Sequence, residues 1–227
     1  MTRRTPLSPD RIIEAAVHVA DHGGLSAVSM RNVAKELGVE AMSLYHHLDG
    51  KDALLDALVE WVFVQIDHPV VGQPWRAQMV VRATSTRDVL SAHPWALGLL
   101  ESRLPGPALM AHHESVLACL RADGFSLELA AHAFSALDAY VHGFVLTEVN
   151  LPFADDGDVD GFAAQVDELL PAQQYPNMAE MLHTRVMGQD YDYGDEFGFG
   201  LDLLLDQLQV HLVGRGDQGS GQTSGQG

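Results

Sequence analysis

Apolar residues recur at intervals of three and four along most of this 227-residue chain. Near the N-terminus, for example, Ile12, Ala15, Ala16 and Val19 follow this spacing. Such residues lie on one face of an α-helix, where they can pack against a core. No segment shows the sustained alternation of apolar and polar residues that is typical of β-hairpins. The sequence therefore predicts an all-α fold.

Glycine and proline divide the first 66 residues into four predicted helices. Ser8-Pro9 is typical of a helix start and Gly23-Gly24 of its end. The next three helices are predicted over 29–37, 40–47 and 51–66, separated by Gly38 and by Asp49-Gly50. This pattern predicts a three-helix N-terminal domain over residues 1–50 and a connecting helix over 51–67.

The rest of the chain is predicted to form a larger helical domain over residues 68–213. Its clearest helices are expected over 75–92, 95–102, 107–123, 127–149 and 195–213. The pattern is weaker in 152–194, where helices are expected near 162–169 and 178–187. Residues 214–227 are rich in glycine and hold little to bury, so we expect a disordered tail there.

The segment from Met30 to His47 has the pattern of a helix-turn-helix. Ala34 allows two short helices to approach closely, and Gly38 allows the tight turn between them. An apolar wedge is expected beneath, formed by Val33, Leu37, Val39 and Leu44. This places Ala41, Met42, Ser43, Tyr45 and His46 on the outer side, where such motifs meet the major groove of DNA. A helical hairpin without a DNA role remains the alternative.

The charge distribution is compatible with DNA binding by the N-terminus only. The chain has a formal net charge of −18, yet residues 1–51 hold six basic and six acidic residues and are neutral. A neutral head on an acidic body is typical of a protein that meets phosphate at one end. It excludes a protein that coats nucleic acid along its whole length.

The helix-turn-helix and its surroundings resemble the DNA-binding domain of the TetR (tetracycline-repressor) family. The resemblance rests on Arg31, Ala34, Leu37-Gly38-Val39 and the run from Leu44 to Leu58, Leu-Tyr-His-His-Leu-Asp-Gly-Lys-Asp-Ala-Leu-Leu-Asp-Ala-Leu. Two later stretches, Gly124 to Glu128 and Phe197 to Asp206, resemble the tetracycline-repressor-type regulatory domain. The resemblance spans roughly residues 8–213. It implies a ligand-responsive transcriptional regulator, most often a repressor, which binds a palindromic operator and is released by a small-molecule inducer.

The resemblance also implies which residues face DNA. The matching positions are Arg31, Ala41, Met42, Ser43, Tyr45, His46, His47 and Lys51. Arg31 can reach a guanine edge or a phosphate, and Lys51 stands at a predicted helix N-terminus that favours phosphate. Ala41 and Met42 replace a more polar pair of the tetracycline repressor, so we expect apolar contacts with thymine methyl groups there.

The resemblance further implies a homodimer and an effector pocket in the larger domain. The two long helices predicted over 127–149 and 195–213 would pair with their symmetry mates in a four-helix interface. Candidate residues for the pocket lining are Trp75, Trp95, His113, Phe134, Asp138 and His142. For each of them, a place in the ordinary core or interface is the alternative interpretation.

A magnesium–tetracycline effector is not expected. In the tetracycline repressor, a histidine, a threonine and a glutamate help to hold magnesium with the drug. Thr147 stands here at the position of that glutamate, and the region near Leu99 offers no matching histidine. We therefore expect an apolar or amphipathic effector, with no metal and no cofactor.

Other signals give weaker predictions. Residues 156–167 resemble an EF-hand loop, but the last ligand position is Asp167 rather than Glu, so a solvated acidic loop is the favoured interpretation. His18 and His22 stand four apart without a third metal ligand. No nucleophile motif or phosphate loop supports an enzyme, although an all-helical ligand-binding protein or enzyme without a DNA role stays the alternative. With one cysteine and no apolar run long enough to span a bilayer, the sequence predicts a cytoplasmic protein without a membrane partner.

Overall fold

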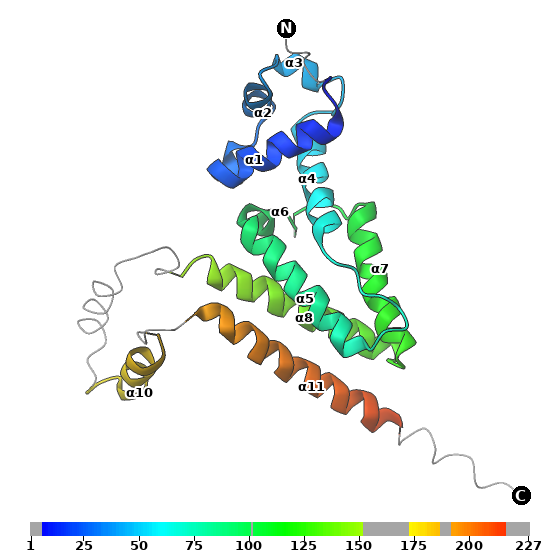
Figure 1. The fold of residues 1–227 in the computed structure, drawn as a ribbon, viewed down its shortest axis with the longest axis vertical. Helices are drawn as coiled ribbons and strands as arrows, with labels where there is room; N and C mark the ends of the chain where they lie inside the picture. The colour runs from blue at the N-terminus through cyan, green and yellow to red at the C-terminus, as the bar shows by residue number, and fades with distance from the viewer. Residues whose placement is uncertain (1–5, 101, 152–172, 187–191, 217–227) are drawn as a thin grey trace, which may run out of the picture.

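A computed structural model describes residues 6–100, 102–151, 173–186 and 192–216. Every regular element in these ranges is helical, as the sequence predicts (Figure 1). The α-helices are α1 (Pro9–Ala27), α2 (Met30–Leu37), α3 (Ala41–Leu44), α4 (Lys51–Gln65), α5 (Trp75–Ala92), α6 (Leu97–Leu100), α7 (Pro107–Ala122), α8 (Leu127–Glu148), α10 (Pro176–Met181) and α11 (Glu196–Gly216). Short 3₁₀ turns precede α6 (Pro94–Ala96) and α11 (Tyr193–Asp195).

The first three helices form a small unit at one end of the molecule (Figure 1). Ser8 caps α1 by accepting a hydrogen bond from the backbone N–H of Arg11, and Pro9 occupies the first helical position. The predicted stop at Gly23-Gly24 is a kink, because Gly24 has φ 67° while the helix resumes as far as Ala27. Ser29 caps α2 in the same way, and Gly38 ends it in the left-handed conformation with φ 63°.

The third helix is shorter than predicted. A helix was expected over 40–47, but α3 ends at Leu44. The backbone N–H groups of His47 and Leu48 both bond to the carbonyl of Leu44, which closes a turn instead of continuing the helix. Gly50, with φ 93°, then leads into α4. Residues 45–47 therefore lie on a turn at the end of the short helix.

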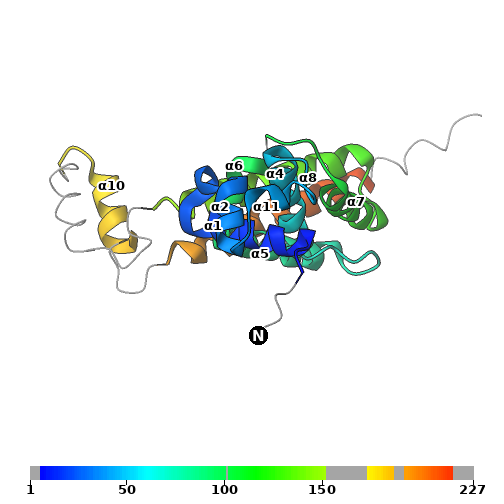
Figure 2. The same ribbon diagram turned by 90° about the horizontal axis from the view of Figure 1, so that it is seen from above.

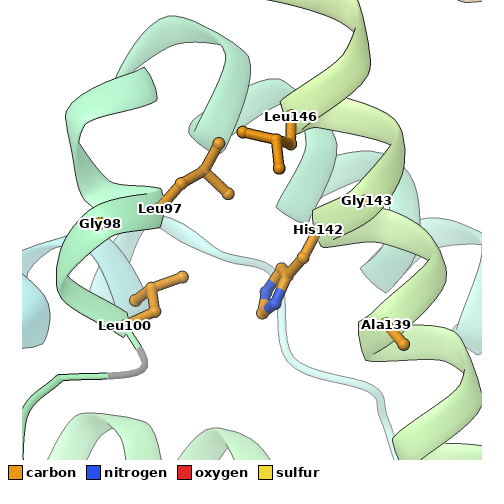
Figure 3. Close-up of a pocket in the computed structure, with 7 residues that line it drawn as sticks. All are labelled: Leu97, Gly98, Leu100, Ala139, His142, Gly143 and Leu146. Carbon is orange, nitrogen blue, oxygen red and sulfur yellow. The ribbon is translucent and has the colours of Figure 1, made fainter.

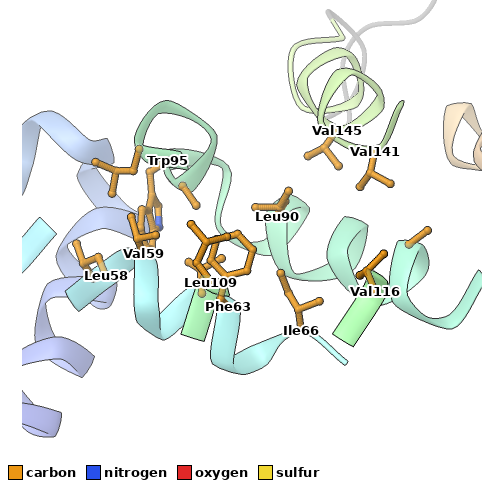
Figure 4. Close-up of a cluster of buried hydrophobic side chains, with 14 of the residues drawn as sticks. Leu58, Val59, Phe63, Ile66, Leu90, Trp95, Leu109, Val116, Val141 and Val145 are labelled. Atoms are coloured by element: carbon orange, nitrogen blue, oxygen red, sulfur yellow. The ribbon is translucent and has the colours of Figure 1, made fainter. Parts of the chain in front are cut away.

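The larger body is built around a bundle of α5, α7 and α8, with α4 entering from the small unit and α11 packed along α8 (Figures 1 and 2). Each helix contributes an apolar stripe to one continuous core. Figure 4 shows the part of this core where α4, α5, α7 and α8 meet, lined by Leu58, Val59, Phe63, Ile66, Leu90, Trp95, Leu109, Val116, Val141 and Val145. Burial of these side chains contributes most of the stability of the body.

A polar contact joins the small unit to the body. Trp95 in the 3₁₀ turn donates its indole N–H to Oδ1 of Asp21 on α1, at 2.6 Å. Nδ1 of His93 lies 2.7 Å from the same oxygen. We call Asp21, His93 and Trp95 the head–body joint. Glu60 of α4 accepts a hydrogen bond from the backbone N–H of Ala108 at 2.7 Å, and in this way it caps the N-terminus of α7.

An ion pair and an aromatic stack hold the end of α8 and the start of α11 in place. Arg87 on α5 pairs with Glu148 at the end of α8, and the carboxylate raises the pKa of Arg87. Ser91 donates to the same carboxylate at 3.1 Å. Tyr140 of α8 stacks on Phe197 of α11, and its hydroxyl donates to the Phe197 carbonyl at 2.7 Å.

Three further helices have bounds that differ from those the sequence predicts. The helix expected over 95–102 is divided into a 3₁₀ turn and α6, which ends at Leu100. The helix expected near 178–187 is α10, followed by a π-helical turn over Leu182–Val186. The last helix, α11, continues to Gly216, so the predicted tail cannot begin at 214. The helix expected near 162–169 and the acidic loop at 156–167 lie outside the described residues.

One helix in the described ranges, α8, is long and apolar enough to cross a membrane by length and composition. In the structure α8 packs against α5, α7 and α11, and its apolar stripe forms part of the core. The same features are expected of the central helix of a helical bundle.

Candidate functional site

The outer side of α3 and the following turn form an exposed surface at the far end of the small unit. Leu44 is fully buried beneath it, against Val33 and Ala34 of α2. Because Leu44 points inward, its neighbours on the helix point outward: Met42 is 70% exposed and Tyr45 is 48% exposed. We call the exposed residues Met42, Tyr45, His46 and His47 the α3 surface.

The other predicted DNA-facing residues surround the α3 surface. Arg31, in the first turn of α2, and Lys51, in the first turn of α4, are both exposed. Ala41 and Ser43 are half-buried, at the edge where α3 meets its neighbours. Two cations and two aromatic or apolar side chains are thereby presented around one short helix. This combination can contact both phosphates and base edges.

A second candidate site lies inside the body, where α5, α7 and α8 meet. Arg82 of α5 is 2% exposed, and its Nε donates to Nε2 of His112 on α7 at 3.0 Å. The same guanidinium forms an ion pair with Asp138 of α8. We call Arg82, His112 and Asp138 the buried triad. Its charges balance, because one cation faces one carboxylate.

The histidine of the buried triad is held neutral. Burial, together with the nearby Arg82, His68 and His113, lowers the pKa of His112 to about 3. A neutral imidazole that accepts a hydrogen bond at Nε2 carries its proton on Nδ1. That Nδ1–H is therefore a donor, and it has no hydrogen-bond partner in the described part of the chain. Arg82 Nη1 is buried and unpartnered in the same way.

A cavity of about 460 Å³ lies between α6 and α8. Figure 3 shows the imidazole of His142 directed from α8 toward Leu97 and Leu100 of α6, with Leu146 at the upper side. The buried triad does not line this cavity, but its member Asp138 precedes His142 by one turn of α8. The cavity walls are mostly apolar, and its volume is in the range of small-molecule sites.

Four of the six predicted pocket residues gather on this side of α7 and α8. His113 packs edge-on against Phe134, with ring centroids 4.7 Å apart. Asp138 belongs to the buried triad, and His142 lines the cavity. Burial lowers the pKa of His113, which keeps it neutral near pH 7. These residues combine flat rings with few polar atoms, as a site for an amphipathic ligand would.

The two tryptophans lie elsewhere. Trp75, at the start of α5, packs against Phe125, which precedes α8, so it lies at the opposite end of α8 from His142. Trp95 belongs to the head–body joint. Both are buried, in agreement with the alternative interpretation that they are core residues.

Arg82 and His112 were missed at the sequence level, although a signal exists for each. Arg82 follows Trp75 and Met79 on the buried stripe of α5 and precedes Thr86 and Leu90. His112 occupies the same kind of position on α7, between Leu109 and Val116. A polar residue in the middle of an apolar stripe must find a partner inside the protein or in a ligand.

The outward faces of α8 and α11 form an apolar surface. On α11 the exposed residues include Phe199, Leu203, Val210 and Val213, and Phe199 is 68% exposed. On α8 the outward side is formed by small residues and exposed leucines, namely Leu127, Ala131, Ser135, Ala139, Gly143 and Leu146. We call these ten residues the α8–α11 face. Contiguous exposed apolar residues of this kind mark protein interfaces.

This face is separate from the regular apolar stripe of α11. The stripe, formed by Phe197, Leu201, Leu204, Leu208 and Leu212, packs into the chain's own core. Both sides of α11 are therefore apolar, one toward α8 and one toward solvent. The side that packs toward α8 is easier to recognise in the sequence, because its apolar residues recur at regular helical spacing.

Two family models together match most of the chain. The model described as "Bacterial regulatory proteins, tetR family" matches residues 12–58, which contain α2, α3 and the start of α4. The model described as "Tetracyclin repressor-like, C-terminal domain" matches residues 68–212, which contain the body.

Curated relatives and solved structures agree with these matches. The chain is 36% identical to the HTH-type transcriptional repressor DrrR1 of Streptomyces coeruleorubidus, covering 92% of this chain and 80% of that protein. It is 28% identical to the class D tetracycline repressor protein of Escherichia coli, over 91% of both chains. Apo ActR of Streptomyces coelicolor is 29% identical with a TM-score of 0.75, covering 95% of this chain and 100% of that chain. ActR in complex with actinorhodin gives a TM-score of 0.72 at 29% identity, covering 92% of this chain and 99% of that chain.

Proposed function

The chain belongs to the TetR family of ligand-responsive transcriptional regulators, and from this premise we propose that it is a homodimeric repressor released from its operator by a small molecule. We assign DNA binding to residues 1–50, the connection to 51–67, and effector binding and dimerisation to 68–213. The cytoplasm, where DNA and small-molecule effectors are both accessible, is the proposed location. No catalytic role is proposed.

The observation that carries this proposal is the α3 surface. Leu44 fixes the orientation of α3, so Met42 and Tyr45 face outward between two exposed cations, Arg31 and Lys51. We propose that Tyr45 and Arg31 contact the major groove and the adjoining phosphates, while Lys51 binds phosphate at the N-terminus of α4. Ala41, Met42, Ser43, His46 and His47 complete the proposed DNA interface.

A single copy offers few cations to DNA, so we propose that two copies bind together. A symmetric dimer places two such heads in successive major grooves, about 34–36 Å apart, on a palindromic site. The α8–α11 face supplies the dimer interface in this proposal, since pairing it with its own copy removes the exposed apolar side chains from water.

We propose that the effector binds beside the buried triad. His113, Phe134, Asp138 and His142 would line the site, together with Arg82 and His112. ActR, a similar structure, has been seen in complex with actinorhodin, and DrrR1 is named a repressor. An effector that fits only one separation of the two heads shifts the dimer away from the DNA-bound form by its differential affinity.

The test is a gel-shift assay of the full chain on the intergenic DNA upstream of its own gene. Removing Tyr45 and Arg31 together, in the double variant Arg31→Ala/Tyr45→Ala, should weaken specific binding by about thirtyfold or more. Each lost base contact costs about 1–3 kcal/mol, which gives this magnitude for two contacts. The charge-matched control is Lys35→Ala, an exposed cation of α2 outside the proposed interface.

The outcome decides between the two functions considered. Unchanged binding of the double variant, or equal binding of the wild type to any duplex, would contradict the proposed DNA interface. A helical ligand-binding protein without a DNA role would then be the better description.

A further inference from the structure

The buried triad contains fully buried donors that have no acceptor. Nε and Nη2 of Arg82 are occupied by His112 and Asp138. Arg82 Nη1, which carries two N–H donors, and Nδ1–H of His112 have no partner in the described ranges. Each of these two buried groups therefore lacks an acceptor. Buried donors without an acceptor are rare, because leaving one unpaired in an apolar interior is unfavourable.

The charges of the triad restrict what that acceptor can be. The carboxylate of Asp138 already balances the guanidinium of Arg82, and His112 is neutral. A second carboxylate or phosphate here would add an uncompensated negative charge beside Asp138, in surroundings where Arg82 is almost fully buried. A neutral acceptor oxygen, such as a ketone or quinone carbonyl, satisfies the donors without this cost.

The surroundings of the triad favour a flat ring system. The ring of Phe63 lies 5.4 Å from that of His112, and His68 meets His112 edge-on at 5.3 Å. His113 and Phe134 form a further pair of rings on the side of Asp138. The cavity that Leu97, Leu100 and Leu146 line starts at His142, one turn of α8 beyond Asp138. Rings of this kind accept aromatic ligands, and Asp138, the carboxylate of the triad, is engaged by Arg82.

We propose that the effector is a neutral aromatic ketone or quinone whose carbonyl oxygen accepts hydrogen bonds from Arg82 Nη1 and His112 Nδ1. This inference rests on the proposed effector site and adds the chemical class of the ligand. Arg82 and His112 are then specificity-determining residues, and Asp138 is a positioning residue that fixes the guanidinium.

The experiment uses three naphthalenes of nearly equal shape with the full-length protein. The neutral carbonyl probe is 2-acetylnaphthalene, the anionic probe is 2-naphthoate, and 2-ethylnaphthalene has no oxygen. Calorimetric titration should show the neutral carbonyl probe binding about tenfold more tightly than either of the others. The preference should disappear in Arg82→Met and in His112→Phe. It should persist in the control Val71→Thr, an exposed position in the loop before α5.

A second readout separates a ligand-binding role from a structural one. In ¹⁵N spectra of the histidine side chains, 2-acetylnaphthalene should shift the His112 Nδ1 resonance of the wild type, and 2-ethylnaphthalene should leave it in place. Equal binding of the three probes, stronger binding of the anionic probe, or no binding of any probe at millimolar concentration would overturn the proposed ligand class. Gel-shift assays on the same samples keep the two proposals apart, since specific DNA binding without the carbonyl preference rejects only this inference.

Discussion

The residue that departs furthest from its ordinary chemistry is His112. Its pKa falls from 6.5 to about 3, first because it is buried, and then because Arg82, His68 and His113 face it. Asp138 is the nearby acidic group, and it is engaged by Arg82. The imidazole thus stays neutral and keeps one fixed tautomer throughout the physiological range, which a ligand-recognising donor requires.

This shift predicts a loss of stability in acid. Below pH 6.5 the unfolded chain binds a proton at His112 that the folded chain refuses down to about pH 3. The free energy of unfolding should therefore fall by about 2 kcal/mol between pH 6.5 and pH 5 from this group alone, at 1.36 kcal/mol per pH unit. Urea unfolding at the two pH values measures it.

The comparison is made with His112→Gln, which keeps an acceptor for Arg82 but does not titrate. The pH dependence of this variant should be shallower by the same amount, whatever its absolute stability. His46→Gln, at an exposed histidine, should retain the wild-type slope. Equal slopes for wild type and His112→Gln would show that His112 is protonated normally.

At the scale of elements, α11 has two apolar sides. Phe197, Leu201 and Leu205 face the core, while Phe199 and Leu203 face outward with Val210 and Val213. A helix apolar all round is expected between two packed bodies. In the isolated chain only one of these bodies is present, which is why we propose that a second copy supplies the other.

The variant Phe199→Glu/Leu203→Glu should therefore shift the protein from dimer to monomer. Burying a Phe or Leu side chain contributes about 1.5–3 kcal/mol, so dimer dissociation should increase at least a hundredfold. Sedimentation equilibrium at micromolar concentration measures this, with the helical circular dichroism signal as a check on folding. Val81→Glu, at an exposed valine of α5, is the matched control. A wild type that sediments as a monomer would refute the proposed interface.

At the scale of the whole molecule, we propose that the head–body joint couples the proposed DNA and effector sites. Leu97 and Gly98 of α6 line the cavity between α6 and α8. They also line a second cavity of about 460 Å³, whose other wall includes Asp21 and Gly24 of α1. The 3₁₀ turn that carries Trp95 directly precedes α6. A displacement of α6 by a ligand would therefore reach α1 through Trp95 and Asp21.

Removing one hydrogen bond should weaken the head–body joint while the aromatic packing at this position is kept. Trp95→Phe keeps an aromatic ring in the core but loses the indole N–H that Asp21 accepts. Such a bond contributes about 0.5–1.5 kcal/mol, so the head should open locally more often. Hydrogen exchange should become faster for the amides of α1, while those of α8 stay protected. Trp75→Phe, which removes no side-chain hydrogen bond described here, should leave α1 unchanged.

The sequence alone was sufficient to predict the fold class and the helix caps and turn of the small N-terminal unit. Ser8, Ser29 and Gly38 act through backbone hydrogen bonds and φ angles within a few residues of themselves, so their roles can be inferred without knowing the tertiary structure. The regular apolar stripes predicted most helices of the body for the same reason. The orientation of α3 followed from Leu44, whose burial turns Tyr45 outward.

Only the tertiary structure decided which long-range partners these stripes meet. Arg82, His112 and Asp138 are separated by at least 26 positions and come together because three helices cross at one place. Trp75 and Trp95 looked alike as pocket candidates, but packing places one beside Phe125 and the other against Asp21. Periodicity reports which side of a helix is buried, and it carries no information on what lies opposite; that is set by how the helices pack.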